Sequence, residues 1–160
     1  MTTNTTTQRL VIVGCSPRKA TTTVPLPALE LYQDWWFPRL RQAVRACRWP
    51  RANVLVLSGQ HGLIPADTPL LPYDQPLTPD RADLLRDPVQ NAFQHHLTGV
   101  ARYSVLLLLA PDYLALLAPA LSAAPPASAH WFPDPDTCWD DAVKVLATWS
   151  RHLNPQSGAR

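Results

Sequence analysis

The stretch from Leu10 to Lys19, LVIVGCSPRK, constrains the fold of this chain more than any other. Four apolar residues, three of them β-branched, run directly into Gly14, which is the pattern of a strand covered on both faces. A thiol, a hydroxyl and two cations follow within five positions of that glycine. Open α/β sheets bind ligands at the carboxyl ends of their strands, so this stretch predicts both a sheet and one wall of a site.

The rest of the chain alternates between short apolar runs and helical segments. Further strands are predicted at residues 53–57, 103–109 and, with a weaker pattern, 127–132. Helices are predicted at residues 28–32, 34–47, 79–97, 110–121 and 138–152. Asp34, Thr78 and Thr137 are the expected caps of three of these helices, and Pro88 is expected to be able to split one of them. This alternation predicts an α/β fold, a single domain with a mostly parallel sheet of about four strands flanked by helices.

The predicted domain covers residues 9–152, between a polar, threonine-rich leader at 1–8 that we expect to be disordered and a frayed tail at 153–160. Two stretches inside it are rich in proline. Residues 15–27 are predicted to form a long loop without regular structure. Residues 63–79 contain five prolines, and we expect an extended arm on the surface rather than an element of the sheet.

Composition restricts the function classes. The net charge of +2, with the cations spread along the chain, does not indicate a general nucleic-acid binder. Three widely separated cysteines fit neither a disulfide framework nor a zinc ribbon and indicate a reduced compartment. No apolar segment reaches the roughly 18 residues of a membrane span, so we expect a soluble, cytoplasmic protein without a membrane partner. His95 and His96 diverge on a helix, and neither a metal nor a cofactor is predicted.

The first candidate site follows the first strand. Cys15 is either a thiolate nucleophile, activated by nearby cations, or a small buried wall residue. Ser16 can orient a ligand. Arg18 and Lys19 can hold a phosphate or carboxylate, although cations in loops are often merely solvated. Neither a GxxxxGK[ST] nor a GxGxxG phosphate motif is present.

The second candidate site is Ser58-Gly59-Gln60-His61-Gly62, after the second strand. His61 is the natural acid or base at neutral pH, Ser58 can orient a ligand, and Gly62 allows close approach of the backbone; the alternative is a plain turn. Tyr32 and Tyr73 can stack on a base, donate a hydroxyl, or pack at the edge of the core. The six tryptophans are expected to be packing residues.

Three linked segments, VGCSPRK, LELYQDWWF and LVLSGQHGLIPADTPLLPYD, resemble the YaaA-like superfamily, especially its small bacterial and phage members with GCSxxK, LY…F and LSxxHGL…PYD motifs. The resemblance covers roughly residues 10 to 80. It implies an α/β fold with the motifs gathered at one pole. Larger YaaA-type proteins are associated with peroxide stress and DNA binding, and small relatives occur beside nucleoside-processing and base-modification genes. The resemblance implies a shared pocket formed by the following residues: Cys15, Ser16, Lys19, Tyr32, Ser58, His61, Gly62 and Tyr73.

The leading functional hypothesis is an enzyme acting on a nucleotide, nucleoside or modified base, at the N-glycosidic bond or at the base itself. Its pocket is expected to be formed by the ends of the first and second predicted strands. In it Lys19 and Arg18 hold the ligand and His61 serves as acid or base, with Ser58 and Cys15 as further catalytic candidates. The alternative is a non-catalytic DNA-binding protein of stress protection, with a basic face formed by Arg39, Arg41, Arg45, Arg48 and Arg51. A third possibility is a small domain that acts through a partner protein bound at its tryptophan-rich carboxyl-terminal part.

Overall fold

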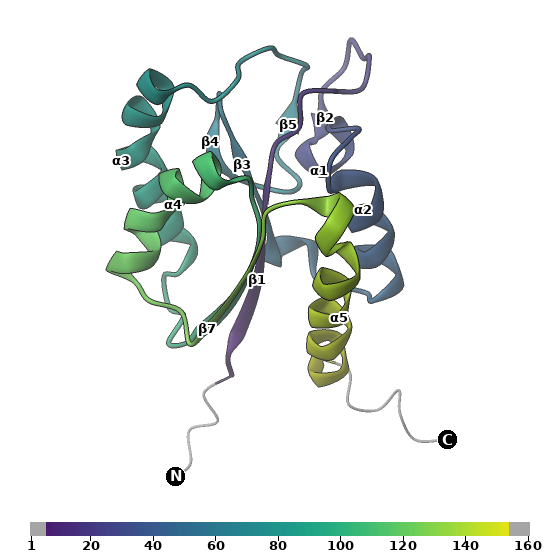
Figure 1. Cartoon of the computed structure of the whole chain (residues 1–160), viewed down its shortest axis with the longest axis vertical. Coiled ribbons are helices and arrows are strands. Elements are labelled where there is room, and N and C mark those ends of the chain that lie inside the picture. The colour runs from purple at the N-terminus through teal and green to yellow at the C-terminus, as the bar shows by residue number, and fades with distance from the viewer. Residues whose placement is uncertain (1–5, 154–160) are drawn as a thin grey trace.

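A computed structural model describes residues 6–153 as a single compact α/β domain built on one five-stranded sheet (Figure 1). The strand order is β4-β3-β1-β6-β7, and all neighbours are parallel except β3 and β4. The strands are β1 (Gln8–Gly14), β3 (Val54–Ser58), β4 (Gly62–Pro65), β6 (Tyr103–Leu108) and β7 (Ser128–Phe132). The α/β prediction with a mostly parallel sheet is confirmed, with one strand more than expected.

Helices cover both faces of the sheet (Figure 1). On one face lie α1 (Ala28–Leu31), α2 (Phe37–Ala46) and α5 (Pro135–Leu153), and on the other lie α3 (Pro79–His96) and α4 (Pro111–Ala123). A 3-10 turn (Arg51–Asn53) precedes β3. None of the helices in the described part of the chain is both long enough and apolar enough to cross a membrane.

The uninterrupted apolar runs arise because each central strand is buried on both faces. In β1, Val11 and Val13 join the core beneath α1, α2 and α5, whereas Leu10 and Ile12 join the core beneath α3 and α4. Successive side chains of a strand point to opposite faces, so a strand between two helical layers needs apolar residues at every position. This is the physical basis of the strand predictions that hold for β1, β3 and β6.

Two short pairings correct the prediction for the proline-rich stretches. Residues 62–65 form β4, an antiparallel edge strand paired with β3, and Pro69–Leu70 form β5, which pairs with β2 (Leu26–Pro27) in a separate two-stranded sheet. The expectation of an arm outside any sheet is therefore wrong for these residues, as is that of a loop without regular structure up to residue 27. Proline is compatible with edge strands, where one row of N–H groups has no ladder partner.

The helix boundaries show which expected caps act. Thr78 accepts a hydrogen bond from the Arg81 amide at the start of α3, as predicted. Asp34 does not cap α2, which begins at Phe37, and Thr137 lies inside α5, because Asp134 and Pro135 start that helix earlier; Asp134 Oδ1 accepts from the Asp136 amide.

Pro88 does not split α3, which is continuous from Pro79 to His96. Its ring is exposed, and the Leu84 side chain, four residues earlier, is 68% exposed. The lost hydrogen bond therefore falls on the solvent side of the helix, where water can replace it. At the amino end, β1 already includes Gln8, so the expected leader is too long; residues 1–5 and 154–160 lie outside the described part.

Candidate functional site at the junction of β1 and β6

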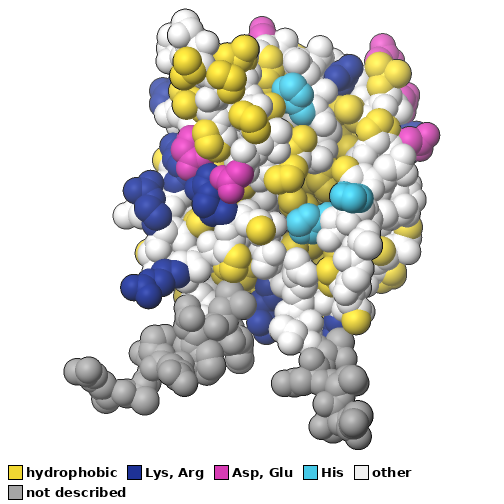
Figure 2. Space-filling model, turned by 180° about the vertical axis from the view of Figure 1, so that it is seen from behind, with side chains coloured by type: hydrophobic (Ala, Val, Ile, Leu, Met, Phe, Trp, Pro, Cys, Tyr) yellow, Lys and Arg dark blue, Asp and Glu magenta, His cyan; other side chains and the backbone are white. Residues whose placement is uncertain are grey.

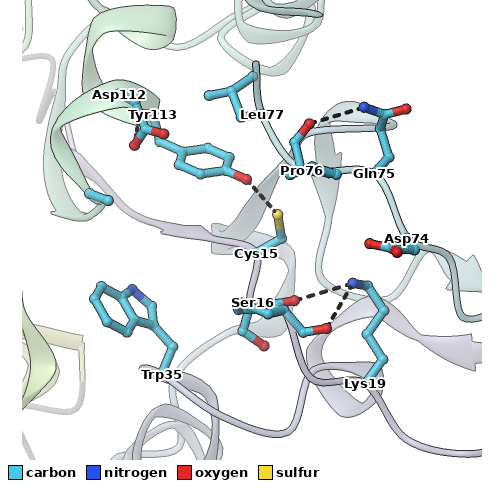
Figure 3. A pocket seen from close by; sticks show the side chains of 12 residues that line it. Cys15, Ser16, Lys19, Trp35, Asp74, Gln75, Pro76, Leu77, Asp112 and Tyr113 are labelled. Carbon is cyan, nitrogen blue, oxygen red and sulfur yellow. Dashed lines mark hydrogen bonds between the residues drawn. The ribbon is translucent and has the colours of Figure 1, made fainter.

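The connections that follow the neighbouring strands β1 and β6 run toward opposite edges of the sheet. The chain passes from β1 through α2 to β3 on one side, and from β6 through α4 to β7 on the other. Such a reversal leaves a crevice outside the carboxyl ends of the two strands, which is where open α/β sheets bind ligands. A cavity of about 340 Å³ lies there (Figure 3). It is lined by Cys15, Ser16, Pro17, Lys19, Trp35, Asp74, Gln75, Pro76, Leu77, Ala110, Asp112 and Tyr113.

Cys15 and Tyr113 meet across this crevice. The Cys15 Sγ lies 3.0 Å from the Tyr113 hydroxyl, at the centre of the residues drawn in Figure 3. Burial, together with the nearby thiol, raises the pKa of Tyr113 well above its ordinary value, so this phenol stays protonated at neutral pH. Asp112 comes from the first turn of α4, and its Oδ1 accepts the Tyr113 amide at 3.0 Å.

Lys19 reaches the cavity because the loop after β1 is tied to the end of α1. The Ala20 amide donates to the Leu31 carbonyl and the Gln33 amide donates to the Arg18 carbonyl, so that Lys19 faces Tyr32 in an isolated bridge. The Lys19 Nζ donates to the Ser16 and Pro17 carbonyls, each at 3.3 Å. It also lies 4.4 Å from the centre of the Tyr73 ring, a cation–π distance.

Arg18 and Ser16 lie differently from each other. Arg18 is exposed and does not line the cavity; its backbone amide donates to Asp34 Oδ1 at 3.3 Å. Ser16 is 2% exposed and lines the cavity, and its hydroxyl donates to the Arg18 carbonyl. Of the four candidate residues after β1, the structure brings Lys19, Ser16 and Cys15 to the cavity and leaves Arg18 outside it.

Tyr32, Tyr73 and Ser58 form a chain of hydroxyls beside Lys19. The Tyr73 hydroxyl lies 2.5 Å from that of Tyr32 and 2.6 Å from the Ser58 hydroxyl. Burial raises the pKa of Tyr32 to about 12, and it raises that of Tyr73 above its ordinary range as well. The resemblance to the YaaA-like superfamily implies that these residues share a pocket. The structure brings their hydroxyls together, although none of the three lines the cavity.

His61 and Gly62 do not line the cavity. They belong to the hairpin between β3 and β4, where Gly62 pairs with Ser58 and adopts a φ of +73° that favours glycine. The exposed His61 ring lies edge-on to Tyr73, with the ring centres 5.0 Å apart. Partial burial, with the Arg81 charge as a further cause, lowers the pKa of His61, so the imidazole is neutral at pH 7.

The sequence interpretation missed the residues that complete the cavity. Trp35 was expected to be a packing residue, yet it lines the cavity, is 40% exposed and has a φ of +63°, which is rare for a bulky side chain. Asp112 and Tyr113 follow β6, after which no candidate site was predicted. Their signal was topological: a strand beside β1 must end in the same crevice.

The expected basic face is largely occupied by internal contacts. Arg41 donates to the Leu29 and Tyr32 carbonyls, at 2.9 and 2.7 Å, and Arg39 donates to the Pro135 carbonyl. Arg51 pairs with Glu30 and Asp67. In the view of Figure 2, acidic side chains lie among the basic ones on one side of the molecule. Three of the five arginines thus donate to protein acceptors, which reduces what they can offer to phosphates.

Within the described residues, no three His, Cys, Asp or Glu side chains are grouped so that they could hold a metal ion.

Comparison with known proteins places the chain in a family. We found no match among curated proteins and none among solved structures. One family model, described as a family of unknown function (DUF6884), matches residues 10–129, which include most of β1, all of β6 and every residue that lines the cavity. Because the match spans well over half of the sequence, the chain belongs to the DUF6884 family.

Proposed function

We propose that this protein is an enzyme acting on a nucleotide, nucleoside or modified base, with its site in the cavity between the carboxyl ends of β1 and β6. The observation that carries the proposal is the set of groups at that cavity: an exposed indole, two carboxylates, a lysine ammonium and a thiol. The resemblance to small YaaA-like proteins, which occur beside nucleoside-processing genes, supports the same substrate class.

The aromatic part of the substrate is assigned to Trp35. An exposed indole at a cavity wall offers a flat face on which any nucleobase can stack. Its backbone holds a conformation that costs on the order of 1–3 kcal/mol, and such strain is concentrated at ligand sites. A base on Trp35 would lie on the same side of the cavity as Ser16, with Asp112 and Tyr113 above it in the view of Figure 3.

The reaction we favour is hydrolysis of the N-glycosidic bond. One oxygen of Asp112 accepts the Tyr113 amide, and the other can accept a proton from a water molecule. The water oxygen then bonds to the anomeric carbon, the carbon–nitrogen bond breaks, and the departing base takes up the proton that Asp112 accepted from the water. Tyr113, which stays protonated, can donate a hydrogen bond to the base. Modification of the base itself is the second reaction compatible with these groups.

Release of free base tests this proposal. We would incubate the protein with the common nucleosides and their 5′-monophosphates and measure free base by chromatography. Asp112→Asn should lower turnover by about 10²–10⁴-fold, the usual contribution of a general base. The control is Asp80→Asn, because Asp80 holds the same position after the first proline of α3 and lies outside the cavity.

Two further variants locate the chemistry. Lys19→Ala should weaken turnover, because Lys19 lines the cavity. His61→Ala should retain most of it, because His61 approaches the cavity only through the Tyr73 ring. Normal turnover by both Asp112→Asn and Lys19→Ala, or no base released from any substrate, would refute the assignment.

A further inference from the structure

The direction of the hydrogen bonds among Ser58, Tyr73 and Tyr32 can be worked out from Ser58. Its hydroxyl oxygen accepts the backbone amides of Gln60 and His61, each at 3.1 Å. A hydroxyl oxygen has two acceptor lone pairs and one hydrogen. With both lone pairs in use, Ser58 must donate its own hydrogen to Tyr73, 2.6 Å away.

Tyr32 fixes the next bond. Its side chain is 0% exposed, and among residues 6–153 its hydroxyl makes a close hydrogen bond with that of Tyr73. The Ser58 hydroxyl is also near Tyr32, but both lone pairs of the Ser58 oxygen are already in use. A buried hydroxyl hydrogen without an acceptor is costly, so Tyr32 donates to Tyr73. Tyr73 then accepts two hydrogen bonds, and its own hydrogen has no acceptor within the described chain. Because burial raises its pKa, Tyr73 keeps that hydrogen at neutral pH.

Lys19 provides a second unsatisfied donor at the same place. Its ammonium group lies over the Tyr73 ring, and its two hydrogen bonds to carbonyls are long, at 3.3 Å. No carboxylate of the described residues lies within 4 Å of it, although Glu30, Asp67, Asp83 and Asp141 all have basic partners. Lys19 lines the cavity, as does Asp74, which follows Tyr73 in the chain. Tyr73 itself does not line the cavity. The Lys19 charge and the spare hydrogen of Tyr73 nevertheless lie close together, and neither has an anionic partner within hydrogen-bond distance in the described chain.

We infer that the ligand of the cavity carries an anionic oxygen, the phosphate of a nucleotide, which binds between the Lys19 ammonium and the Tyr73 hydroxyl. This inference rests on the proposed function, since it takes the ligand to be a nucleotide rather than a nucleoside or free base. A phosphate oxygen can accept from both groups at once, and hydrogen bonds between charged partners are the stronger ones. Trp35 and Lys19 flank Ser16 on opposite sides (Figure 3), so the base and the phosphate would occupy the two ends of the site.

Calorimetric titration tests this inference, with three kinds of probe: a nucleoside 5′-monophosphate, the matching nucleoside, and inorganic phosphate. We expect the monophosphate to bind at least about tenfold more tightly than the nucleoside. Tyr73→Phe and Lys19→Met should each lower the affinity for the monophosphate more than the affinity for the nucleoside, and so remove most of that preference. Tyr32→Phe is the matched control: it also deletes one phenol oxygen from the chain but leaves the outward hydrogen of Tyr73, so the preference should remain. Thermal melts establish that each variant is folded.

The outcomes separate this inference from the proposed function. Equal affinities of the wild-type protein for nucleoside and monophosphate would overturn the phosphate inference while leaving a nucleoside enzyme. An equal loss of preference in Tyr32→Phe and Tyr73→Phe would overturn the assigned direction of the hydrogen bonds. Binding of inorganic phosphate that needs Tyr73 and Lys19, without any nucleotide binding, would support the anion site and refute the proposed function. Absence of binding by all three probes would overturn both.

Discussion

Gly59, in the turn between β3 and β4, packs against the arm at residues 75–77, which line the cavity. Replacement of Gly59 by alanine is the sharpest test of this packing. A Cβ atom at position 59 would lie 2.7 Å from the Gln75 carbonyl oxygen and 3.1 Å from the Leu77 amide nitrogen. Ordinary carbon contacts begin near 3.5 Å, so the arm would have to move by several tenths of an ångström. The obstacles are backbone atoms, which cannot rotate away as a side chain would.

The expected cost follows from two opposing effects. Overpacking of this kind destabilises proteins by about 1–3 kcal/mol, whereas replacing glycine by alanine restricts the unfolded chain and stabilises by about 0.4–1 kcal/mol. Gly59→Ala should therefore lower the free energy of unfolding by about 1–2 kcal/mol, which corresponds to a fall in Tm of roughly 2–8 °C for a domain of this size. Because residues 75–77 line the cavity, ligand affinity should fall as well.

Gly14→Ala is the matched control, since Gly14 ends the neighbouring strand β1. Its Cβ would meet Leu109 Cδ2 at 3.5 Å and Tyr113 Cγ at 3.7 Å, which are ordinary van der Waals distances. We expect Gly14→Ala to be neutral or slightly stabilising in urea unfolding. Equal unfolding free energies for Gly59→Ala and Gly14→Ala would refute the close approach of the arm to the hairpin.

The remaining predictions concern the tyrosines and one arginine. Burial raises the pKa of all four tyrosines, Tyr32, Tyr73, Tyr103 and Tyr113, so the native protein binds more protons than the unfolded chain above pH 10. Their contribution to stability is complete below pH 10 and is lost as the pH rises further. Phenolate absorbance should therefore appear together with unfolding. Titration of a tyrosine near pH 10 in the native protein would contradict this prediction. Arg41→Ala should cost about 1–3 kcal/mol in urea unfolding, because it removes the donor to the Leu29 and Tyr32 carbonyls, whereas exposed Arg45→Ala should change stability by less than about 0.5 kcal/mol. If Arg41 instead served DNA, the loss would appear in salt-dependent duplex binding and not in stability.

The sequence predicted the parts of the structure that depend on local patterns. Apolar runs at every position indicated the central strands, and Thr78 followed by a proline indicated the start of α3. It could not reveal which strand ends adjoin, because neighbours in a sheet are set by long-range packing. The expectation that the ends of β1 and β3 adjoin is correct, since the two strands are parallel neighbours, but β1 also neighbours β6 and the cavity lies on that side. This explains why Lys19 and Cys15 were identified, whereas Tyr113 was missed and His61 lies outside the cavity.

Tyr32 contributes both to the hydrophobic core and to the chain of hydroxyls beside Lys19, which limits the substitutions that this position can accept. Its ring packs in the core beneath α1 and α2, at 4.7 Å from the Phe37 ring, while its hydroxyl belongs to the polar chain beside Lys19. A substitution of Tyr32 that alters the size or shape of its ring must be tolerated by the core, and most such changes would destabilise the protein before they altered its ligand. Trp35 and Asp74 are exposed, so substitutions at these two positions do not disturb the core. Relatives that accept different substrates are therefore expected to differ at Trp35 and Asp74 and to keep Tyr32.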